Sequence, residues 1–277
     1  MEGIAQVQDA EGFTAATRTS HGMDTARKET GPLASLRQAL EQQEFRLAYQ
    51  PIIDLRNRAP IGFEALIRWP RANIGPDVFI PVAEHGGLIR EITRSVCRQA
   101  AQDRVTRCAS GQVRLSINLS AADAESMETV ALLATLAETL GGGTALCVEL
   151  TERSLLAPGR CGPVLQAIRA LGIQVHLDDF GIGYANFQSL IELPLDGIKI
   201  DHSLIRRIDA STTARLVIRH LAKLTGALGL AVTAEGVETE SQARILKSLG
   251  IRQAQGWLFG LPKYIEDYPA HLMTRRS

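Results

Sequence analysis

Short apolar runs alternate with helical stretches along almost the whole chain, and this alternation restricts the possible folds more than any other feature. Stretches with helical spacing, such as "GPVLQAIRAL" and "TARLVIRHLAKLTGAL", separate most of the runs. Strands and helices that alternate in this way favour a parallel sheet, and roughly eight strands in about 240 residues match a (β/α)8 TIM-like barrel. The apolar runs are Phe45–Ile53, Ile61–Ile67, Val113–Leu119, Ala145–Leu150, Ile173–Leu177, Gly197–Ile200, Leu230–Ala234 and Arg252–Gly256.

The link between the first two runs breaks this pattern. It consists only of "DLRNRAP", whereas a connection between parallel strands needs about a dozen residues or more. We therefore predict that these two strands form an antiparallel hairpin. The expected fold is an α/β, modified (β/α)8 barrel with an antiparallel first strand. A doubly wound open sheet is the alternative, but no GxGxxG motif follows the first strand.

Charge and composition exclude several other classes. Lys plus Arg and Asp plus Glu each number 30 in the 277 residues, so bulk charge does not favour a DNA or RNA partner. We find no secretory signal and no membrane-spanning stretch, which predicts a cytoplasmic protein. Residues 1–31 are polar and aperiodic, and are expected to form a disordered or weakly ordered leader before a barrel at 32–277. The four cysteines form no CxxC motif, which favours reduced, buried thiols.

Polar side chains recur at or near the ends of the predicted strands. A single Glu in a strand is usually a solvent-facing residue, but in a barrel all the strand ends meet at one rim. Several carboxylates there would repel one another unless a cation joined them, and oxygen donors select Mg²⁺ or Mn²⁺. The number of donors exceeds the need of one ion, so we predict two. These polar residues are Glu64, Asn118, Glu149, Asp178, Asp179, Lys199, Glu235 and Gln255.

Several neighbouring residues have simpler explanations. Lys199 either holds a phosphate oxygen or lowers the pKa of a nearby water, or it is an ordinary strand-end residue paired with Asp201. Arg68 either binds phosphate through two nitrogens or pairs at the surface with Glu84 or Asp77. We interpret His85 and His176 as structural or incidental. The "DFG" triplet lacks the remaining kinase motifs. A glycosidase would also use two carboxylates, but it would leave the surplus acids and Asn118 unexplained.

At this point the sequence resembles the EAL domain of bacterial cyclic di-GMP phosphodiesterases. "FEALIRW" contains the Glu-Ala-Leu triplet that names this family, and "YQPIIDL" precedes it. The blocks "FIPVAEHGGLI", "SINLS", "VELTE", "LDDFGIGY", "LPLDGIKID", "AEGVETESQ" and "QGWLFGLP" follow in the family's order, as far as Pro262. The resemblance implies a (β/α)8-like barrel whose first strand is antiparallel. It also implies that two Mg²⁺ or Mn²⁺ ions support hydrolysis of cyclic di-GMP to linear pGpG.

The resemblance also assigns a role to each matching position. The metal ligands it implies are Glu64, Asn118, Glu149, Asp178 and Asp179. The catalytic residues it implies are Glu235, Lys199 and Asp179, and the residues that contact the dinucleotide or the surroundings of the metal are Gln50, Leu66, Arg68 and Gln255. Glu152 corresponds to a loop-anchoring glutamate and Glu238 to a supporting residue. The family further implies a homodimer.

This chain departs from the family's usual pattern in the loop "DDFGIGYANF". Ile182 stands where Thr or Ala is usual, and Ala185, Asn186 and Phe187 stand where Ser-Ser-Leu is common. In the family this loop couples the metal site to the dimer interface. The segment "RWPRANIGPDVFIP" is also about three residues shorter than usual, and Trp257 replaces Tyr or Phe. The altered loop supports an alternative function: a catalytically weak EAL domain that senses cyclic di-GMP or binds a protein.

Overall fold

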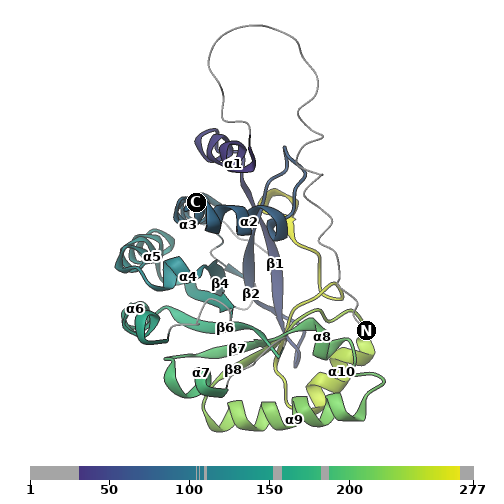
Figure 1. The fold of residues 1–277 in the computed structure, drawn as a ribbon. Coiled ribbons are helices and arrows are strands. Elements are labelled where there is room, and N and C mark those ends of the chain that lie inside the picture. The colour runs from purple at the N-terminus through teal and green to yellow at the C-terminus, as the bar shows by residue number, and fades with distance from the viewer. Residues whose placement is uncertain are drawn as a thin grey trace, which may run out of the picture.

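A barrel forms the centre of the protein in the computed structural model (Figure 1). The structure describes residues 31–103, 105, 107–108, 111–151, 158–181 and 187–268, so the predicted leader lies outside the described residues except for Gly31. The strands are β1 (Arg46–Asp54), β2 (Pro60–Arg68), β3 (Arg107–Cys108), β4 (Gly111–Leu119), β5 (Thr144–Thr151), β6 (Gln174–Phe180), β7 (Gly197–Ile200), β8 (Ala231–Ala234), β9 (Gln253–Ala254) and β10 (Lys263–Tyr264).

The pairing of these strands confirms the predicted topology. Strands β2, β4, β5, β6, β7, β8 and β9 are neighbours in that order, and each pairs in parallel with the next. β1 closes the barrel because it pairs antiparallel with β2 on one side and with β9 on the other. The short segments β3 and β10 add antiparallel pairs to β4 and β1. The link between β1 and β2 is therefore the hairpin that its length predicts, and each of the eight apolar runs overlaps a barrel strand.

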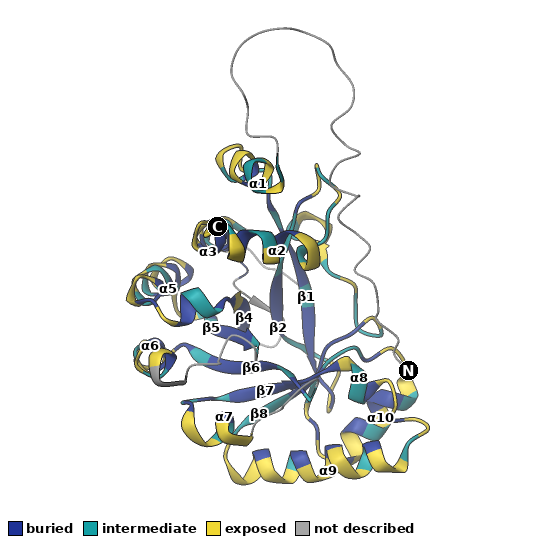
Figure 2. Cartoon of the chain, in the orientation of Figure 1, coloured by how far each residue is buried: buried dark blue, intermediate teal, exposed yellow. Residues whose placement is uncertain are grey.

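Helices cover the outside of the barrel and turn their apolar faces toward it (Figures 1 and 2). In α9 the buried side chains recur every three or four residues, at Ala214, Ile218, Leu221 and Thr225, whereas the opposite face is exposed. The helices are α1 (Pro32–Glu41), α2 (Pro76–His85), α3 (Ile89–Asp103), α4 (Ala121–Ala124), α5 (Met127–Leu140), α6 (Pro158–Ala170), α7 (Phe187–Glu192), α8 (His202–Ile205), α9 (Thr212–Ala227) and α10 (Glu240–Ser248), with short 3-10 turns η2 (Gly141–Gly143) and η4 (Ile265–Asp267).

Two faces of each barrel strand carry different chemistry. In β4 the apolar residues Val113, Leu115 and Ile117 are buried and alternate with Arg114 and Ser116, which are also buried. Because successive side chains of a strand point to opposite faces, the apolar set packs under the helices and the polar set faces the barrel interior. The interior is therefore polar, which is the arrangement that brings the charged residues of different strands together.

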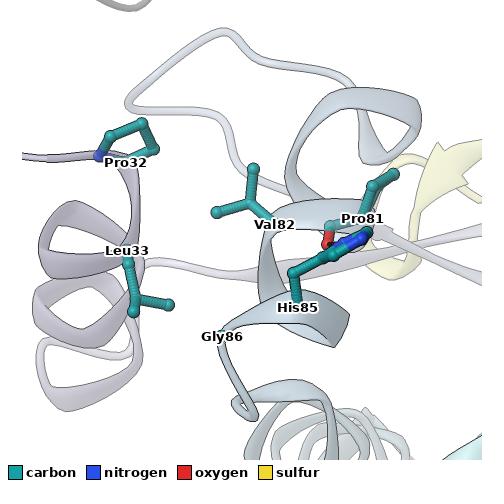
Figure 3. A pocket seen from close by; sticks show the side chains of 6 residues that line it. All are labelled: Pro32, Leu33, Pro81, Val82, His85 and Gly86. Carbon is teal, nitrogen blue, oxygen red and sulfur yellow. Dashed lines mark hydrogen bonds between the residues drawn. The ribbon is translucent and has the colours of Figure 1, made fainter.

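Several features away from the predicted site residues are consistent with a structural role. The thiols of Cys97, Cys147 and Cys161 are buried, as the sequence predicts, and form no disulfide with one another. Six residues, shown in Figure 3, line an apolar groove between α1 and α2, and none of them belongs to the predicted site. His85 lines this groove and bonds through Nδ1 to the Pro81 carbonyl of its own helix, 2.7 Å away, in agreement with a structural role. Among the described helices, none is long and apolar enough to cross a membrane.

Candidate active site

Lys199 lies at the centre of the predicted site. Its side chain is 1% exposed, and it extends from β7 into the barrel, where its ammonium nitrogen contacts four carboxylates from four other strands or strand ends. The interpretation of Lys199 as a strand-end residue paired with Asp201 is wrong, because Asp201 instead caps α8 and bonds His202. The Nζ distances are 3.1 Å to Glu64, 2.6 Å to Glu149, 3.4 Å to Asp178 and 2.7 Å to Glu235.

Glu64 is held in place by amide donors as well as by Lys199. The Asn118 amide nitrogen donates to Glu64 Oε1 over 2.8 Å, and the Gln255 amide nitrogen donates to Oε2 over 2.7 Å. Gln255 also donates to Gln50 Oε1 over 2.9 Å, and Gln50 is the register partner of Glu64 across the β1–β2 hairpin. The antiparallel strand β1 thus contributes Gln50 to the site. Gln50 bonds Gln255, which follows β9, and Gln255 in turn bonds the Glu64 carboxylate on β2.

The adjacent residues Asp178 and Asp179 both point toward the site, although neighbours in a regular strand face opposite sides. The backbone explains this, because Asp179 has a φ of 57° and the register of β6 against β7 shifts between Leu177 and Phe180. Asp tolerates the left-handed region better than most residues. The Asp178 carboxylate accepts the Asp179 backbone N–H over 2.8 Å, which fixes the local turn. The irregular strand end is what brings both acids to Glu235.

Burial and mutual repulsion shift the pKa values of these groups. The pKa of Glu149 is raised to about 7, chiefly by burial and also by the neighbouring Glu64 and Asp178, while Lys199 opposes the rise. The pKa of Glu235 lies well above its ordinary value, again mainly because of burial. Burial also disfavours ionised Glu64, but Lys199 and the amide donors outweigh it and lower the pKa of Glu64. The pKa of Lys199 is raised well above its ordinary value because the surrounding carboxylates outweigh its burial.

The carboxylates form two adjacent groups with the geometry of metal sites. Ligand oxygens of Glu64, Glu149 and Asp178 lie within 4.8 Å of one another, and so do those of Asp178, Asp179 and Glu235. Asp178 belongs to both groups. All the donors are oxygen, so the residues fit a hard divalent cation such as Mg²⁺ or Mn²⁺. When ionised, the five carboxylates and the Lys199 ammonium leave four formal negative charges, which two divalent cations would balance.

The remaining predicted residues occupy less central positions. Leu66 and Arg68 follow Glu64 at every second position of β2 and are partly buried. One Arg68 nitrogen donates to the Ile67 carbonyl over 2.9 Å, and burial lowers the pKa of its guanidinium. The Glu238 side chain is exposed and makes no ion pair with another described residue, whereas its backbone N–H bonds Gln242. Glu152, Ile182, Ala185 and Asn186 lie outside the described residues, whereas Phe187 begins α7 and is exposed.

The sequence interpretation gave His176 no part in the site, but the structure places it next to Glu149. A ring nitrogen of His176, the Cys147 sulfur and a Glu149 oxygen lie within 4.8 Å of one another, and all three side chains are buried. His176 precedes Asp178 by two residues, and Cys147 precedes Glu149 by two residues. This period of two is the signal that places both residues on the inner face of their strands.

Known proteins resemble this chain over nearly its whole described length. The EAL domain model matches residues 33–262. The chain is 37% identical over 246 residues to a cyclic di-GMP phosphodiesterase of Pseudomonas aeruginosa, covering 85% of this chain and 42% of that protein. It is 32% identical over 249 residues to a probable cyclic di-GMP phosphodiesterase of Escherichia coli, covering 87% of this chain and 47% of that protein. The chain therefore spans less than half the length of these relatives.

A solved structure agrees with these sequence matches. The PaMucR phosphodiesterase in complex with cyclic di-GMP superposes with a TM-score of 0.76 at 32% identity, and the match covers 85% of this chain and 98% of that one. Residues 33–262, which the family model matches, include the barrel strands, the hairpin that closes the barrel and the strand ends that carry the carboxylates. By its sequence match and its barrel, the chain belongs to the EAL domain family.

Proposed function

We propose that this chain is a metal-dependent phosphodiesterase that hydrolyses cyclic di-GMP to linear pGpG. The observation that carries the proposal is the pair of oxygen-donor groups that share Asp178 and surround Lys199 at one end of the barrel. Curated relatives named as cyclic di-GMP phosphodiesterases support the choice of substrate. When bound, two Mg²⁺ or Mn²⁺ ions would neutralise phosphate charge and make water nucleophilic near neutral pH.

The chain's own residues would supply the rest of the chemistry. Glu64, Asn118, Glu149 and Asp178 would hold one cation, while Asp179 and Glu235 would hold the second together with Asp178. Glu235 is also suited to accept a proton from water, because burial raises its pKa well above its ordinary value. Lys199 would hold the carboxylates in place and would stabilise the negative charge that develops on the phosphate.

Substrate binding would use the residues around the two carboxylate groups that would hold the cations. Arg68 is partly buried and lies four residues beyond Glu64 on the same strand, so its guanidinium would contact a phosphate or a guanine of the dinucleotide. Gln50 and Gln255 would align both the substrate and Glu64, since they already form one hydrogen-bonded chain with that carboxylate. Leu66 would supply apolar contact with a base. Glu152 and Glu238 would support the neighbouring loops.

A turnover assay tests this function directly. Purified protein would be incubated with cyclic di-GMP and MnCl2, and the linear product would be separated by chromatography. The matched control is Glu64→Gln, which keeps the shape of the side chain but removes its charge. We expect pGpG from the wild-type chain and at least about 100-fold less from the variant, more than a lost supporting residue would cost. Equal product from both proteins would contradict the proposal, and tight binding without product would replace it with the sensor function.

We further propose that the protein acts as a homodimer through the surface around α7. Phe187 and Ile191 on this short helix are 58% and 83% exposed, which is unusual for large apolar side chains one turn apart. Light scattering after gel filtration would show a dimer for the wild-type chain and a monomer for Ile191→Glu. The matched control is Val78→Glu on α2, where a 46% exposed apolar residue lies on a different helix.

A further inference from the structure

A second polar layer lies in the barrel directly beneath the two carboxylate groups of the proposed metal site. Its members precede site residues of the same strands or strand ends by two positions, or by four in the case of Arg114 and Asn118, so their side chains share the inner face. Arg114 donates to Gln253 Oε1 over 2.9 Å, and Thr233 donates to the same oxygen over 3.1 Å. His176 and Cys147 complete the side of the layer that lies under Glu149.

Several polar atoms of this layer have no hydrogen-bond partner among the described residues. They are both ring nitrogens of His176, the Nε of Arg114 and the Oγ of Ser116, which precedes Asn118 by two positions. In the site above them, the Oε1 atoms of Glu149 and Gln255 are also without a partner among the described residues. The His176 side chain is 1% exposed and that of Glu149 is equally buried. Buried polar groups are nearly always hydrogen-bonded, so a group of such atoms close together requires an explanation.

The position of the His176 ring is fixed by its surroundings. His176 is the register partner of Glu149 on one side and of Gly197 on the other. A Cβ atom added at Gly197 would lie 2.8 Å from His176 Nε2, so the ring occupies the space that a side chain of β7 would need. Gly197 therefore makes room for an imidazole at this level of the barrel. The ring and the Glu149 carboxylate lie within 4.8 Å but form no direct hydrogen bond.

The missing partner has to satisfy donors and acceptors at once. A cation on Cys147, His176 and Glu149 would accept nothing from the unpaired Arg114 N–H, and it would lie close to the Lys199 ammonium, which bonds Glu149 over 2.6 Å. A water molecule donates and accepts, and one at about 2.8 Å from each of two atoms joins groups about 4–5 Å apart. Both ring nitrogens of the buried His176 lack a partner among the described residues, so the ring can offer such a molecule an N–H donor or an accepting nitrogen.

We propose that His176 is a positioning residue for Glu149, acting through a buried water that bonds both the imidazole and Glu149 Oε1. Glu149 Oε2 already bonds Lys199 over 2.6 Å, so this second contact fixes the rotation of the carboxylate. The inference rests on the proposed function, because it concerns how well Glu149 is aligned to bind a divalent cation. Outer groups that orient a metal ligand typically change metal affinity by about 10–100-fold.

Binding of Mn²⁺ to the full chain without substrate tests the inference. Free Mn²⁺ would be measured by electron paramagnetic resonance for the wild-type chain, His176→Leu, His176→Gln and His220→Leu, which alters an exposed histidine of α9. We expect His176→Leu to weaken binding by about tenfold or more, since Leu fills the space without a polar atom. Gln keeps a donor and an acceptor and should restore the affinity to within about threefold. The His220 variant should match the wild type.

Two results of this binding experiment would overturn the inference: wild-type affinity in His176→Leu, or equal weakening by Leu and Gln. Failure of the proposed function has a different signature, because wild-type protein and Glu64→Gln would then show the same turnover. A crystal structure of the unmodified chain provides a test that does not require the variants to fold. It should show a water within about 3.2 Å of both His176 and Glu149 Oε1. A zinc anomalous peak on Cys147 and His176 in zinc-soaked crystals would replace the water with a cation and refute the proposal.

Discussion

The ammonium nitrogen of Lys199 lies 2.6 Å from Glu149 Oε2, and neither side chain is more than 1% exposed. A buried lysine is stable here because Glu64, Asp178 and Glu235 also lie within 3.4 Å of it. In the absence of a divalent cation, Lys199 is therefore the charge that keeps these carboxylates compatible with one another. This relationship connects the stability of the barrel to whether the proposed metal site is occupied.

Replacement of Lys199 by Met should destabilise the metal-free protein strongly. Removing one partner of a buried ion pair typically costs about 3–5 kcal/mol, because the remaining charges are left uncompensated. MnCl2 should recover part of this loss, since divalent cations supply the missing positive charge. Urea unfolding in EDTA and in MnCl2 would measure both effects, with Lys223→Met on the exposed side of α9 as the control. A Lys199 variant as stable as the wild type in EDTA would contradict the arrangement of charges described here.

Stabilisation by Mn²⁺ should increase as the pH rises through about 7. Burial holds the pKa of Glu149 at about 7 in the folded chain, above its ordinary value of 4.5. Because its pKa is raised, protonated Glu149 favours the metal-free fold over the unfolded chain. This contribution to stability is fully present below pH 4.5 and is lost as the pH rises through 7. A bound cation, in contrast, requires the ionised form. The difference in melting temperature with and without MnCl2, measured from pH 6 to pH 8, should therefore grow. Glu149→Gln should flatten this dependence, and a flat profile in the wild-type chain would contradict it.

Much of the fold follows from local sequence rules. Each predicted strand is an apolar run, and the hairpin between β1 and β2 follows from a link too short for a parallel crossover. The polar strand ends also predicted which residues come together, because parallel strands place their carboxyl ends at one rim. Glu64 is an instructive case, since it lies in the middle of β2 and its part in the site depends on how far β2 is staggered against β4.

Other features depend on three-dimensional relationships that a linear pattern does not carry. The sequence left Lys199 with two interpretations, because its partners are contributed by strands far away in the chain. The two-residue alternation places His176 on the inner face, but only the register of β5, β6 and β7 shows that it lies between Glu149 and Gly197. The left-handed backbone at Asp179 is likewise not predictable from a strand pattern, since it depends on the shift of register against β7.

Substitutions at Asp179 should separate its backbone role from its charge. Its φ of 57° favours Gly or Asn, and a residue such as Ala pays about 1–2 kcal/mol in this region. We expect Asp179→Gly and Asp179→Asn to unfold at similar urea concentrations and Asp179→Ala to unfold at a lower one. All three remove the carboxylate and should lose one of two bound Mn²⁺ ions in a titration. Equal stability of the Ala and Asn variants would contradict the backbone role, and unchanged stoichiometry would contradict the ligand role.

Gly197→Ala should disturb the layer beneath the metal site without removing any polar group. The added Cβ would lie 2.8 Å from His176 Nε2 and 3.0 Å from the Ala231 carbonyl, so either the ring or the strand has to move. Overpacking of this kind typically costs about 1–3 kcal/mol. The matched control is Gly226→Ala in α9, where nothing lies within 4 Å of the added atom and a gain of about 0.4–1 kcal/mol is expected. Because His176 is displaced rather than deleted, Gly197→Ala should weaken Mn²⁺ binding as well as lower stability. An unchanged Mn²⁺ affinity in a clearly destabilised variant would show that the ring does not orient Glu149.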